Sequence, residues 1–534
     1  MQKRLYCVAL ALVASCGVDG APPPGRDLDI SAVKAQGTDP RTPAPVGTWA
    51  PLTNTPPVAA AAFHLLAPDG TVILQDLETS NWYRLTPDNT GSYKNGTWSQ
   101  MGSMPSGYAP LYFSSQWLPD GRLVAMGGEY NGPSGASWTN LGAIYDPTMD
   151  KWTSLAAPSG WTTIGDAQSQ LLNDGTMMIA DCCSANEAAL DATSLTWTPT
   201  GQGKLDWNDE EGWTMLPDGT ILTLDCNVQS GSDPKGTEFF DPTSKSWTAG
   251  SDLPVQLADV GATYELGPAP LRGDGTVFAV GALPANAIYD TKTKTWTVGP
   301  TFPGGIVGQD APAAVLPNGN ILLVASPPGE SFPSPVSFFE LDPSNNMNAA
   351  PATPNATSDA SYQVGLLVLP SGEVMETDFS TDVELYTPGT GPDMTYAPDI
   401  ISIPEMVSST GGTAGTKYPR TPLPTTPTQG VSLTTLYAGQ TYSVWANRIN
   451  GVTEGAYYGD DEQPSTGFAI VRLTNMASGH VAFARTHHES TYAIGADVVG
   501  ATLFDVPATA ESGTTQMSIV TNGIPSPAIQ VEVR

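Results

Sequence analysis

The sequence contains few basic residues. Its 534 residues include 21 lysines and arginines against 53 aspartates and glutamates, which gives a net charge of −32. A protein of that sign repels phosphate backbones, so a nucleic acid is excluded as a partner. A solvated acidic surface that keeps the chain soluble explains this charge, and a cation-binding role is the alternative.

Several catalytic signatures are also missing. The chain has only four histidines, and it shows neither a Ser-His-Asp spacing, nor a phosphate-binding loop, nor a Gly-x-Ser-x-Gly motif. Beyond the N-terminus, no apolar stretch is long enough to span a bilayer. The abundant residues are 55 glycines and 49 prolines, which is typical of an all-β chain rich in turns.

The N-terminus has the pattern of an export signal. Lys3 and Arg4 precede a short apolar segment, which ends in small residues before Cys16. The ending Val-Ala-Ser-Cys resembles a bacterial lipobox, which implies a signal peptide over residues 1–15 and lipidation of Cys16; ordinary cleavage nearby is the alternative. Residues 16–46 are rich in proline, glycine and charge, and are predicted to form a flexible tether.

One pattern recurs along the middle of the chain. An apolar run, a turn dipeptide ending in glycine, a second apolar run, an aromatic-Asp-Pro corner and a closing Trp-Thr together predict a sheet of about four strands. The turn dipeptides recur at intervals of 44 to 56 residues and are Asp69-Gly70, Asp120-Gly121, Asp174-Gly175, Asp218-Gly219, Asp274-Gly275, Asn318-Gly319 and Ser371-Gly372. Seven such repeats predict a seven-bladed β-propeller over residues 47–392.

The repeat resembles a divergent kelch repeat, because the kelch double glycine occurs only at Gly127-Gly128. The chain after the propeller follows another pattern. Residues 393–430 are predicted to form a linker with an inserted loop, and residues 431–534 an immunoglobulin-like β-sandwich. Its strands are predicted at Gln440–Trp445, Phe468–Leu473, His480–Arg485, Ala501–Val506, Gln516–Thr521 and Ile529–Val533.

Three cysteines lie beyond the N-terminal segment. Cys182 and Cys226 occupy matching places in neighbouring blades, and Cys183 follows Cys182 directly. Either a cross-blade disulfide to Cys226 or a bond between Cys182 and Cys183 is compatible with this spacing, and one thiol is left over.

A kelch-like propeller followed by an immunoglobulin-like module resembles the galactose oxidase and glyoxal oxidase superfamily. The likeness covers nearly the whole mature chain. It is strongest in segments similar to bacterial kelch-containing relatives, at residues 456–461, 471–475, 479–481, 484–487 and 522–526. The resemblance implies the fold more directly than the chemistry.

The resemblance also implies where a copper site would lie. In that family two tyrosines, one of them cross-linked to a cysteine, and two histidines hold copper at the propeller axis. The corresponding positions here carry Asp166 for the cysteine, Glu210 for its tyrosine, and Tyr362-Gln363 for a Tyr-His pair. The C-terminal loop with His487 and His488 is the candidate source of the remaining histidine. Copper-radical oxidation is therefore not expected.

The same positions predict an acidic funnel at the axis. The expected ligand-binding residues are Tyr112, Asp166, Glu210, Glu265, Asp310, Tyr362, Gln363, Arg485, His487 and His488. Converging carboxylates repel one another unless they are protonated, paired or well solvated. A hard cation such as Ca²⁺ suits Asp166, Glu210 and Asp310, and His487 would favour a transition metal. Wide, hydrated propeller mouths without a bound ion are the alternative, so no cofactor is assigned.

These observations lead to one expected function and its competitors. We expect an exported, lipid-anchored monomer that binds a carbohydrate or another small ligand at the funnel. Its place would be the outer membrane, the periplasm or the cell surface of a bacterium, with the lipid anchor as its only membrane contact. The alternatives are a metal-dependent hydrolase or lyase at the funnel, a surviving galactose or glyoxal oxidase-like copper oxidase, and a structural adhesin. The sequence leaves open whether the chain is an enzyme.

Overall fold

The computed structural model describes residues 45–133, 135–226, 234–261, 263–407, 418, 420–423, 433–458 and 465–534. The predicted signal peptide, Cys16 and all but the last two residues of the tether lie outside these residues. The described chain is built from strands, with two short 3₁₀ turns at Pro303–Gly305 and Ser361–Gln363. No described helix has the length and apolar character needed to cross a membrane.

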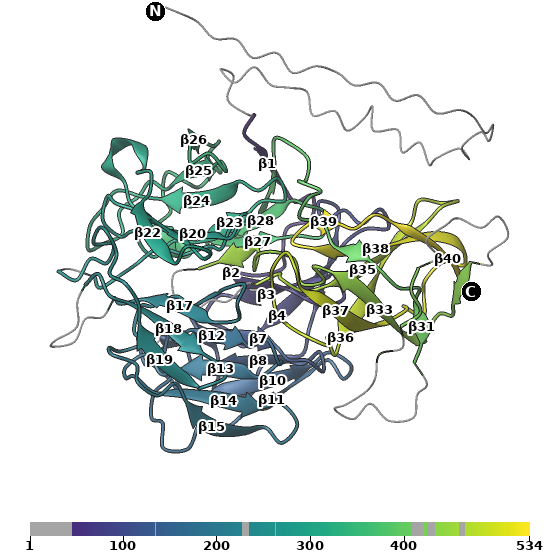
Figure 1. Cartoon of the computed structure of the whole chain (residues 1–534), viewed down its shortest axis with the longest axis horizontal. Coiled ribbons are helices and arrows are strands. Elements are labelled where there is room, and N and C mark those ends of the chain that lie inside the picture. The colour runs from purple at the N-terminus through teal and green to yellow at the C-terminus, as the bar shows by residue number, and fades with distance from the viewer. Residues whose placement is uncertain are drawn as a thin grey trace, which may run out of the picture. The chain divides into compact units, whose positions relative to one another are not determined.

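Seven small antiparallel sheets form a propeller, which confirms the predicted fold and blade number (Figure 1). Blade one contains β2 (Ala61–Leu66), β3 (Val72–Asp76), β4 (Trp82–Thr86) and β5 (Thr97–Gln100). Blade two contains β7 (Ser114–Trp117), β8 (Leu123–Met126), β10 (Gly142–Asp146) and β11 (Lys151–Ser154), next to a short ladder of β6 (Pro110–Leu111) and β9 (Tyr130–Asn131). Blade three contains β12 (Ser169–Leu171), β13 (Met177–Ala180), β14 (Glu187–Asp191) and β15 (Thr196–Thr200).

The remaining blades vary this plan. Blade four contains β16 (Thr214–Met215), β17 (Ile221–Leu224), β18 (Thr237–Asp241) and β19 (Ser246–Ala249). Blade five has three strands, β20 (Thr276–Ala279), β21 (Ala287–Asp290) and β22 (Thr295–Val298), with a single bridge from Leu271 to Val277 on the inner side. Blade six contains β23 (Ala313–Val315), β24 (Ile321–Ala325), β25 (Ser337–Leu341) and β26 (Met347–Ala349). Blade seven contains β27 (Gly365–Val368), β28 (Val374–Thr377) and β29 (Glu384–Thr387).

The fourth strand of blade seven comes from the start of the propeller. Strand β1 (Thr48–Pro51) pairs with β29, so the two ends of the propeller are joined in one sheet. Trp49 lies opposite Tyr386, with ring centroids 4.7 Å apart. The same pairing of a closing tryptophan with an aromatic corner occurs between Trp152 and Tyr145, at 5.1 Å. Trp49 therefore supplies the closing tryptophan that blade seven lacks in its own repeat.

The turn dipeptides adopt the backbone that their glycines were expected to provide. All seven glycines have a positive φ, between 76° and 88°, which costs a residue without Cβ little. Several of these turns lie against the C-terminal module. A Cβ on Gly70 would come within 2.6 Å of the Phe483 ring, and one on Gly175 within 3.0 Å of Tyr492. Because these turns join the first and second strands of a blade, the first strand begins at the end of the propeller that is opposite to the C-terminal module.

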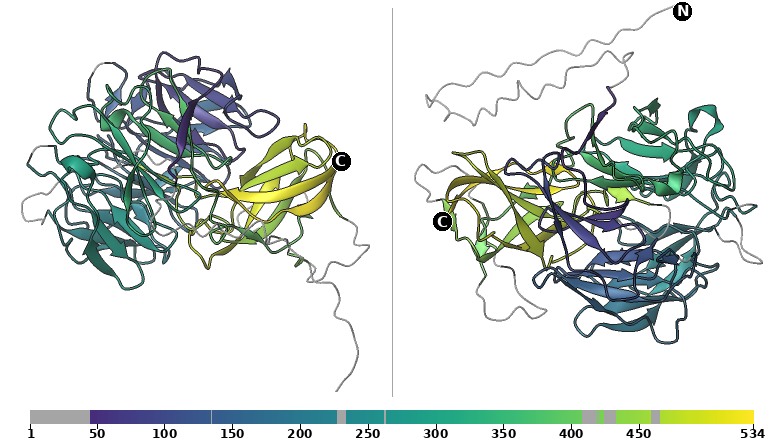
Figure 2. Two further views of the ribbon diagram at one scale, coloured as in Figure 1. Left: turned by 90° about the horizontal axis from the view of Figure 1, so that it is seen from above. Right: turned by 180° about the vertical axis from the view of Figure 1, so that it is seen from behind.

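The C-terminal module is one curled sheet around its own core (Figure 2). All six predicted strands are present, as β33 (Thr441–Asn447), β35 (Ile470–Asn475), β36 (Val481–His487), β37 (Val499–Asp505), β38 (Gly513–Thr521) and β40 (Ile529–Val533). The sheet is completed by β30 (Asp399–Ile400), β31 (Glu405–Met406), β32 (Thr434–Leu436) and β39 (Ile524–Pro525). Side chains such as Val444, Phe504 and Ile519 fill the core between its walls, as in a sandwich.

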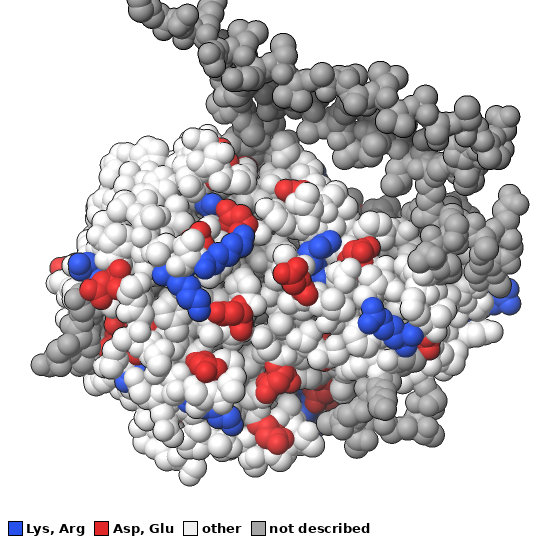
Figure 3. Space-filling model, viewed as in Figure 1, with Lys and Arg blue, Asp and Glu red and all other residues white. Residues whose placement is uncertain are grey.

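Acidic and basic side chains are interspersed among uncharged ones where described residues form the face in Figure 3. The acidity of the chain is therefore spread out on this face. A solvated surface of this kind favours solubility.

Candidate ligand site at the propeller axis

A segment of the C-terminal module enters the propeller. Strand β34 (Ala456–Tyr457) pairs with β23, the innermost strand of blade six. The Glu454 carboxylate accepts hydrogen bonds from Gln170 Nε2 at 2.7 Å in blade three and from the Met215 N–H at 3.3 Å in blade four. The Tyr458 hydroxyl donates to the Tyr362 carbonyl in blade seven, at 2.9 Å. Residues 454–458 thus touch the inner strands of several blades, which places them at the axis.

Glu454 is almost fully buried in this segment. Burial raises its pKa to about 7, and the hydrogen bonds from Gln170 and Met215 act in the opposite direction. Its carboxyl group therefore changes charge near neutral pH inside the protein. The Gln170 Oε1 atom beside it is buried and has no hydrogen-bond partner.

A pocket of about 340 Å³ lies at the axis, at the end where the first strands begin. Its described lining consists of Glu78, Leu111, Tyr112, Glu129, Tyr130, Asp166, Glu210, Glu265, Asp310, Phe332, Tyr362 and Phe379. Six of these residues are acidic, five are aromatic and none is basic. The volume is within the range of about 300–1,000 Å³ that is typical of small-molecule sites.

Unusual backbone conformations position half of this lining. Glu78, Tyr112, Glu210, Asp310, Phe332 and Phe379 all have a positive φ, between 43° and 63°. This conformation is unfavourable for residues with a side chain, and it is found most often at ligand sites and turns that the surrounding structure holds in place. The blades therefore hold these side chains at the pocket against a local conformational preference.

Burial and the negative charge of the pocket raise the pKa of one of its tyrosines, Tyr130. Burial, followed by the charge of Glu129, raises the pKa of Tyr130 to about 12, and Asp166 contributes to the same shift. Asp166 and Glu265 are buried, whereas the other four acids are partly exposed. The Tyr130 hydroxyl therefore remains protonated over the physiological range and can donate a hydrogen bond.

The structure brings together six of the ten predicted site residues. Tyr112, Asp166, Glu210, Glu265, Asp310 and Tyr362 all line the pocket. Gln363 does not: its Oε1 accepts the Ala360 N–H at 2.8 Å and closes a 3₁₀ turn. Whether the six residues bind a ligand stays a prediction.

The C-terminal basic residues Arg485, His487 and His488 do not line this pocket. They lie on or just after β36, and His487 lines another pocket together with Gln170 and Glu454. Arg485 pairs with Asp505 at 3.2 Å, and His487 Nε2 lies 3.4 Å from the same carboxylate. The two histidines contact each other through their Nδ1 atoms, at 2.7 Å. The segment with Glu454 contacts the inner strands of blades three, four and six.

The prediction missed six residues of the lining. One is Leu111 of β6, and the other five are Glu78, Glu129, Tyr130, Phe332 and Phe379. Each of these five follows the second strand of its blade, namely β3, β8, β24 or β28. Counting back from the turn dipeptides locates only residues before the first strand. Counting forward from the second apolar run would have found these loops.

The lining does not fit a copper-radical centre. None of the four histidines contributes to the pocket. His64 is buried between blades one and seven, where its Nε2 lies 3.3 Å from the Met375 carbonyl, and His480 pairs with Glu511. No cysteine belongs to the lining either, so the cross-linked tyrosine and the imidazole ligands of such a centre have no counterpart there.

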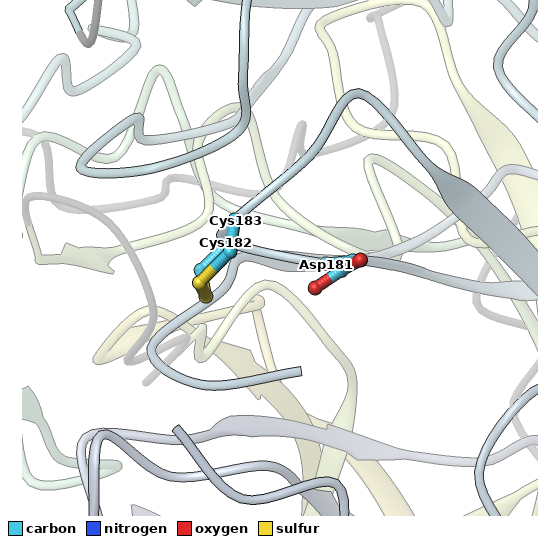
Figure 4. A group of neighbouring side chains, drawn as sticks. All are labelled: Asp181, Cys182 and Cys183. Carbon is cyan, nitrogen blue, oxygen red and sulfur yellow. A yellow bond between two sulfur atoms is a disulfide. The ribbon is translucent and has the colours of Figure 1, made fainter. Parts of the chain in front are cut away.

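The cysteines adopt one of the two predicted pairings. Cys182 and Cys183 form a disulfide directly after β13, beside Asp181 (Figure 4). Cys226 is a buried free thiol, so the cross-blade alternative is not formed. Ligand atoms of Asp166, Cys182 and Asp209 lie within 4.8 Å of one another, but this sulfur is already bonded to Cys183.

A second group with metal-ligand spacing holds a lysine. Oxygen atoms of Asp206, Asp225 and Glu238 lie within 4.8 Å of one another. Lys204 Nζ is 2.5 Å from Asp206 and 2.8 Å from Glu238, and it also contacts Glu211 at 2.9 Å. The side chains of these four ion-paired residues are fully buried, so the ammonium group offsets part of the negative charge of the three carboxylates inside the protein.

Comparisons with known proteins agree with a kelch-like propeller. No family model matches the chain. A curated relative, the kelch-like protein terF of Aspergillus terreus (strain NIH 2624 / FGSC A1156), is 27% identical over 262 residues, which are 43% of this chain and 54% of the relative. The match thus spans about half the length of that relative.

Two solved structures show the extent of the structural likeness. A fungal alcohol oxidase of the AA5 family in complex with copper is 14% identical, with a TM-score of 0.49 over 92% of this chain and 100% of that one. A streptogramin B lyase is 11% identical, with a TM-score of 0.44 over 64% of this chain and 98% of that one. The seven blades and the kelch-like relative are consistent with a kelch-like propeller.

Proposed function

We propose that the axial pocket binds a small ligand, a carbohydrate or another small molecule, and performs no copper-radical chemistry. The observation that carries this proposal is the lining of the pocket. Carboxylates and aromatic rings from separate blades converge on one cavity, and half of the lining has an unfavourable backbone conformation. Concave sites with several convergent polar groups are the usual places for small ligands.

The lining supports binding by two kinds of contact. Aromatic faces such as those of Tyr112 and Phe379 provide apolar area for a ring or carbon chain. Carboxylates such as Asp166 and Glu210 accept hydrogen bonds from hydroxyl or amino groups. Oxygen donors suit a hard divalent cation, for which Asp166, Glu210 and Asp310 are the predicted ligands. No two of these three acids occur together in a described group of side chains with metal-ligand spacing, and His487 does not line this pocket.

A ligand screen tests this proposal. Thermal unfolding of the purified protein would be followed against a library of neutral sugars, amino acids, amines and divalent cations, and each stabilising compound would be repeated on Asp166→Asn. We expect at least one compound that raises the midpoint in the wild type and raises it less in the variant. Stabilisation by ligand binding follows from mass action. A library without any compound that depends on Asp166 would contradict the proposal.

Elemental analysis separates binding from the alternatives. Copper bound in a one-to-one ratio would contradict the exclusion of copper. Calcium, zinc or manganese that is lost in Glu210→Gln would favour a metal-assisted site. If the pocket is an acid/base enzyme, Asp166→Asn should lose most of its rate, whereas a binding site should show a modest change in affinity.

Export and a lipid anchor at Cys16 complete the proposed function. The N-terminal pattern supports them. Membrane fractionation of the wild type and of Cys16→Ala tests this part, with release of the variant into the soluble fraction as the expected result.

A further inference from the structure

The charge of the axial pocket narrows the class of ligand. Its described lining contains six carboxylates and no lysine, arginine or histidine. Carboxylates around one cavity repel each other, and the repulsion falls when a cation enters. A neutral ligand leaves this repulsion in place. The lining therefore favours a positively charged ligand over a neutral one.

The acids are spread around the axis instead of converging on one point. Asp166 belongs to blade three, Glu210 to blade four, Glu265 to blade five and Asp310 to blade six, each before the first strand or inner edge. Among the described residues, a single group of three with metal-ligand spacing contains an acid of the pocket. This group consists of Asp166, Asp209 and Cys182, and the sulfur of Cys182 is already bonded to Cys183. A single metal ion requires several oxygens at about 2.0–2.6 Å, which a dispersed ring supplies poorly. A ligand that carries several ammonium groups along one carbon chain can instead place each of them against a separate acid.

Aromatic rings cover the other part of the lining. Tyr112 lies 6.2 Å from Tyr130 and 6.3 Å from Phe379 between ring centroids, and Phe332 lies 5.4 Å from Tyr362. These residues come from blades two, six and seven. All five rings line the same pocket, and aromatic faces attract cations and pack against methylene groups.

We propose that the axial pocket binds a small aliphatic polyamine, whose ammonium groups pair with carboxylates of different blades while its methylene chain lies against the aromatic rings. This inference rests on the proposed function and names the ligand class of the same site. Because the acids are spread around the axis, the ligand should carry more than one positive charge. Because the aromatic rings of Tyr112 and Phe379 also line the pocket, the ligand should have an apolar segment between its charges.

Calorimetric titration with matched probes tests the inference. The probes are spermidine, putrescine, and 1,4-butanediol, which has the carbon chain of putrescine with hydroxyl groups in place of the amines. We expect saturable binding of both amines and none of the diol. Asp166→Asn and Glu210→Gln should each weaken spermidine binding by about fivefold or more, since each removes a charged hydrogen-bond acceptor. Phe379→Leu should weaken it by a similar factor.

Asp497→Asn is the matched control, because Asp497 is an exposed acid of the C-terminal module. It should bind spermidine like the wild type. Circular dichroism and the unfolding midpoint would show that each variant is folded. Raising the salt concentration should weaken the binding of the amines, because salt screens the attraction between their ammonium groups and partly exposed carboxylates.

Four outcomes would overturn the polyamine assignment. They are no saturable heat with either amine, equal affinity for the diol, unchanged spermidine binding in all three pocket variants, or calcium that binds at this site while the amines do not. A neutral sugar that binds in an Asp166-dependent way would overturn the polyamine class and leave the proposed function standing. A screen in which no compound depends on the pocket would overturn both.

Discussion

Replacing Glu454 with glutamine should change how the stability of the protein depends on pH. Burial raises the pKa of Glu454 from the reference value of 4.5 to about 7. The folded state therefore holds this proton more tightly than the unfolded state, so stability falls as pH rises from 4.5 to 7. The shift of about 2.5 units, at about 1.4 kcal/mol each, corresponds to a loss on the order of 3 kcal/mol.

Glu454→Gln removes the titrating group but keeps an amide of similar shape. The new carbonyl oxygen can accept the Met215 N–H, and the new amino group can donate to Gln170 Oε1 once that side chain turns, which would give this oxygen the partner it lacks. We expect the variant to gain stability relative to the wild type as pH rises, by roughly 3 kcal/mol between pH 4.5 and 8.

The assay is urea unfolding followed by tryptophan fluorescence, at several pH values between 4.5 and 8.5. Other buried acids, such as Glu187 with a pKa raised to about 8 by burial, titrate in both proteins and cancel in the difference. Glu330→Gln, at an exposed site, is the control and should follow the wild type. If the free energy of unfolding of Glu454→Gln changed with pH in parallel with that of the wild type, the reasoning would be refuted, because Glu454 would then have the same pKa in the folded and unfolded states.

Three further predictions concern the scaffold. Trp49→Ala should lower the stability by about 2–4 kcal/mol, because it removes the ring that closes blade seven; thermal unfolding measures this, and an unchanged midpoint would argue against closure by β1. Lys204→Met should cost about 3–5 kcal/mol in urea unfolding, since it leaves three buried carboxylates without their cation, and adding Glu211→Gln should recover part of that loss. Burial raises the pKa of Cys226, so iodoacetamide should label this thiol only after unfolding, and the neighbouring pair of cysteines only after reduction; labelling of all three without a reductant would contradict the disulfide.

Much of the scaffold could be predicted because its signals are local. A turn such as Asp69-Gly70 needs only a positive φ at glycine and a side chain that accepts the Thr71 N–H at 3.0 Å. The flanking apolar runs then fix which residues pair. The same holds for the acids before the first strands, since their distance from the turn is set by the strand length.

The residues missed by the prediction depend on distant parts of the chain. Trp49 completes a blade whose other strands lie more than 300 residues later, and no local pattern marks that partner. The entry of Glu454 into the axis depends on whether its segment fits between inner strands of several blades. His487 ends β36, where it pairs with Leu503 of β37 and contacts Asp505, and no local pattern in the sequence marks these partners.

The sequence by itself determined the all-β class, the seven repeats and the row of acidic residues at the strand entrances, because each of these follows from turn chemistry and strand length within about 50 residues. Only the tertiary structure decided how the ring closes, which segment fills the axis, which loops complete the pocket and which cysteines pair. Those outcomes depend on the distances between residues far apart in the chain, which are fixed when the blades pack around a common axis.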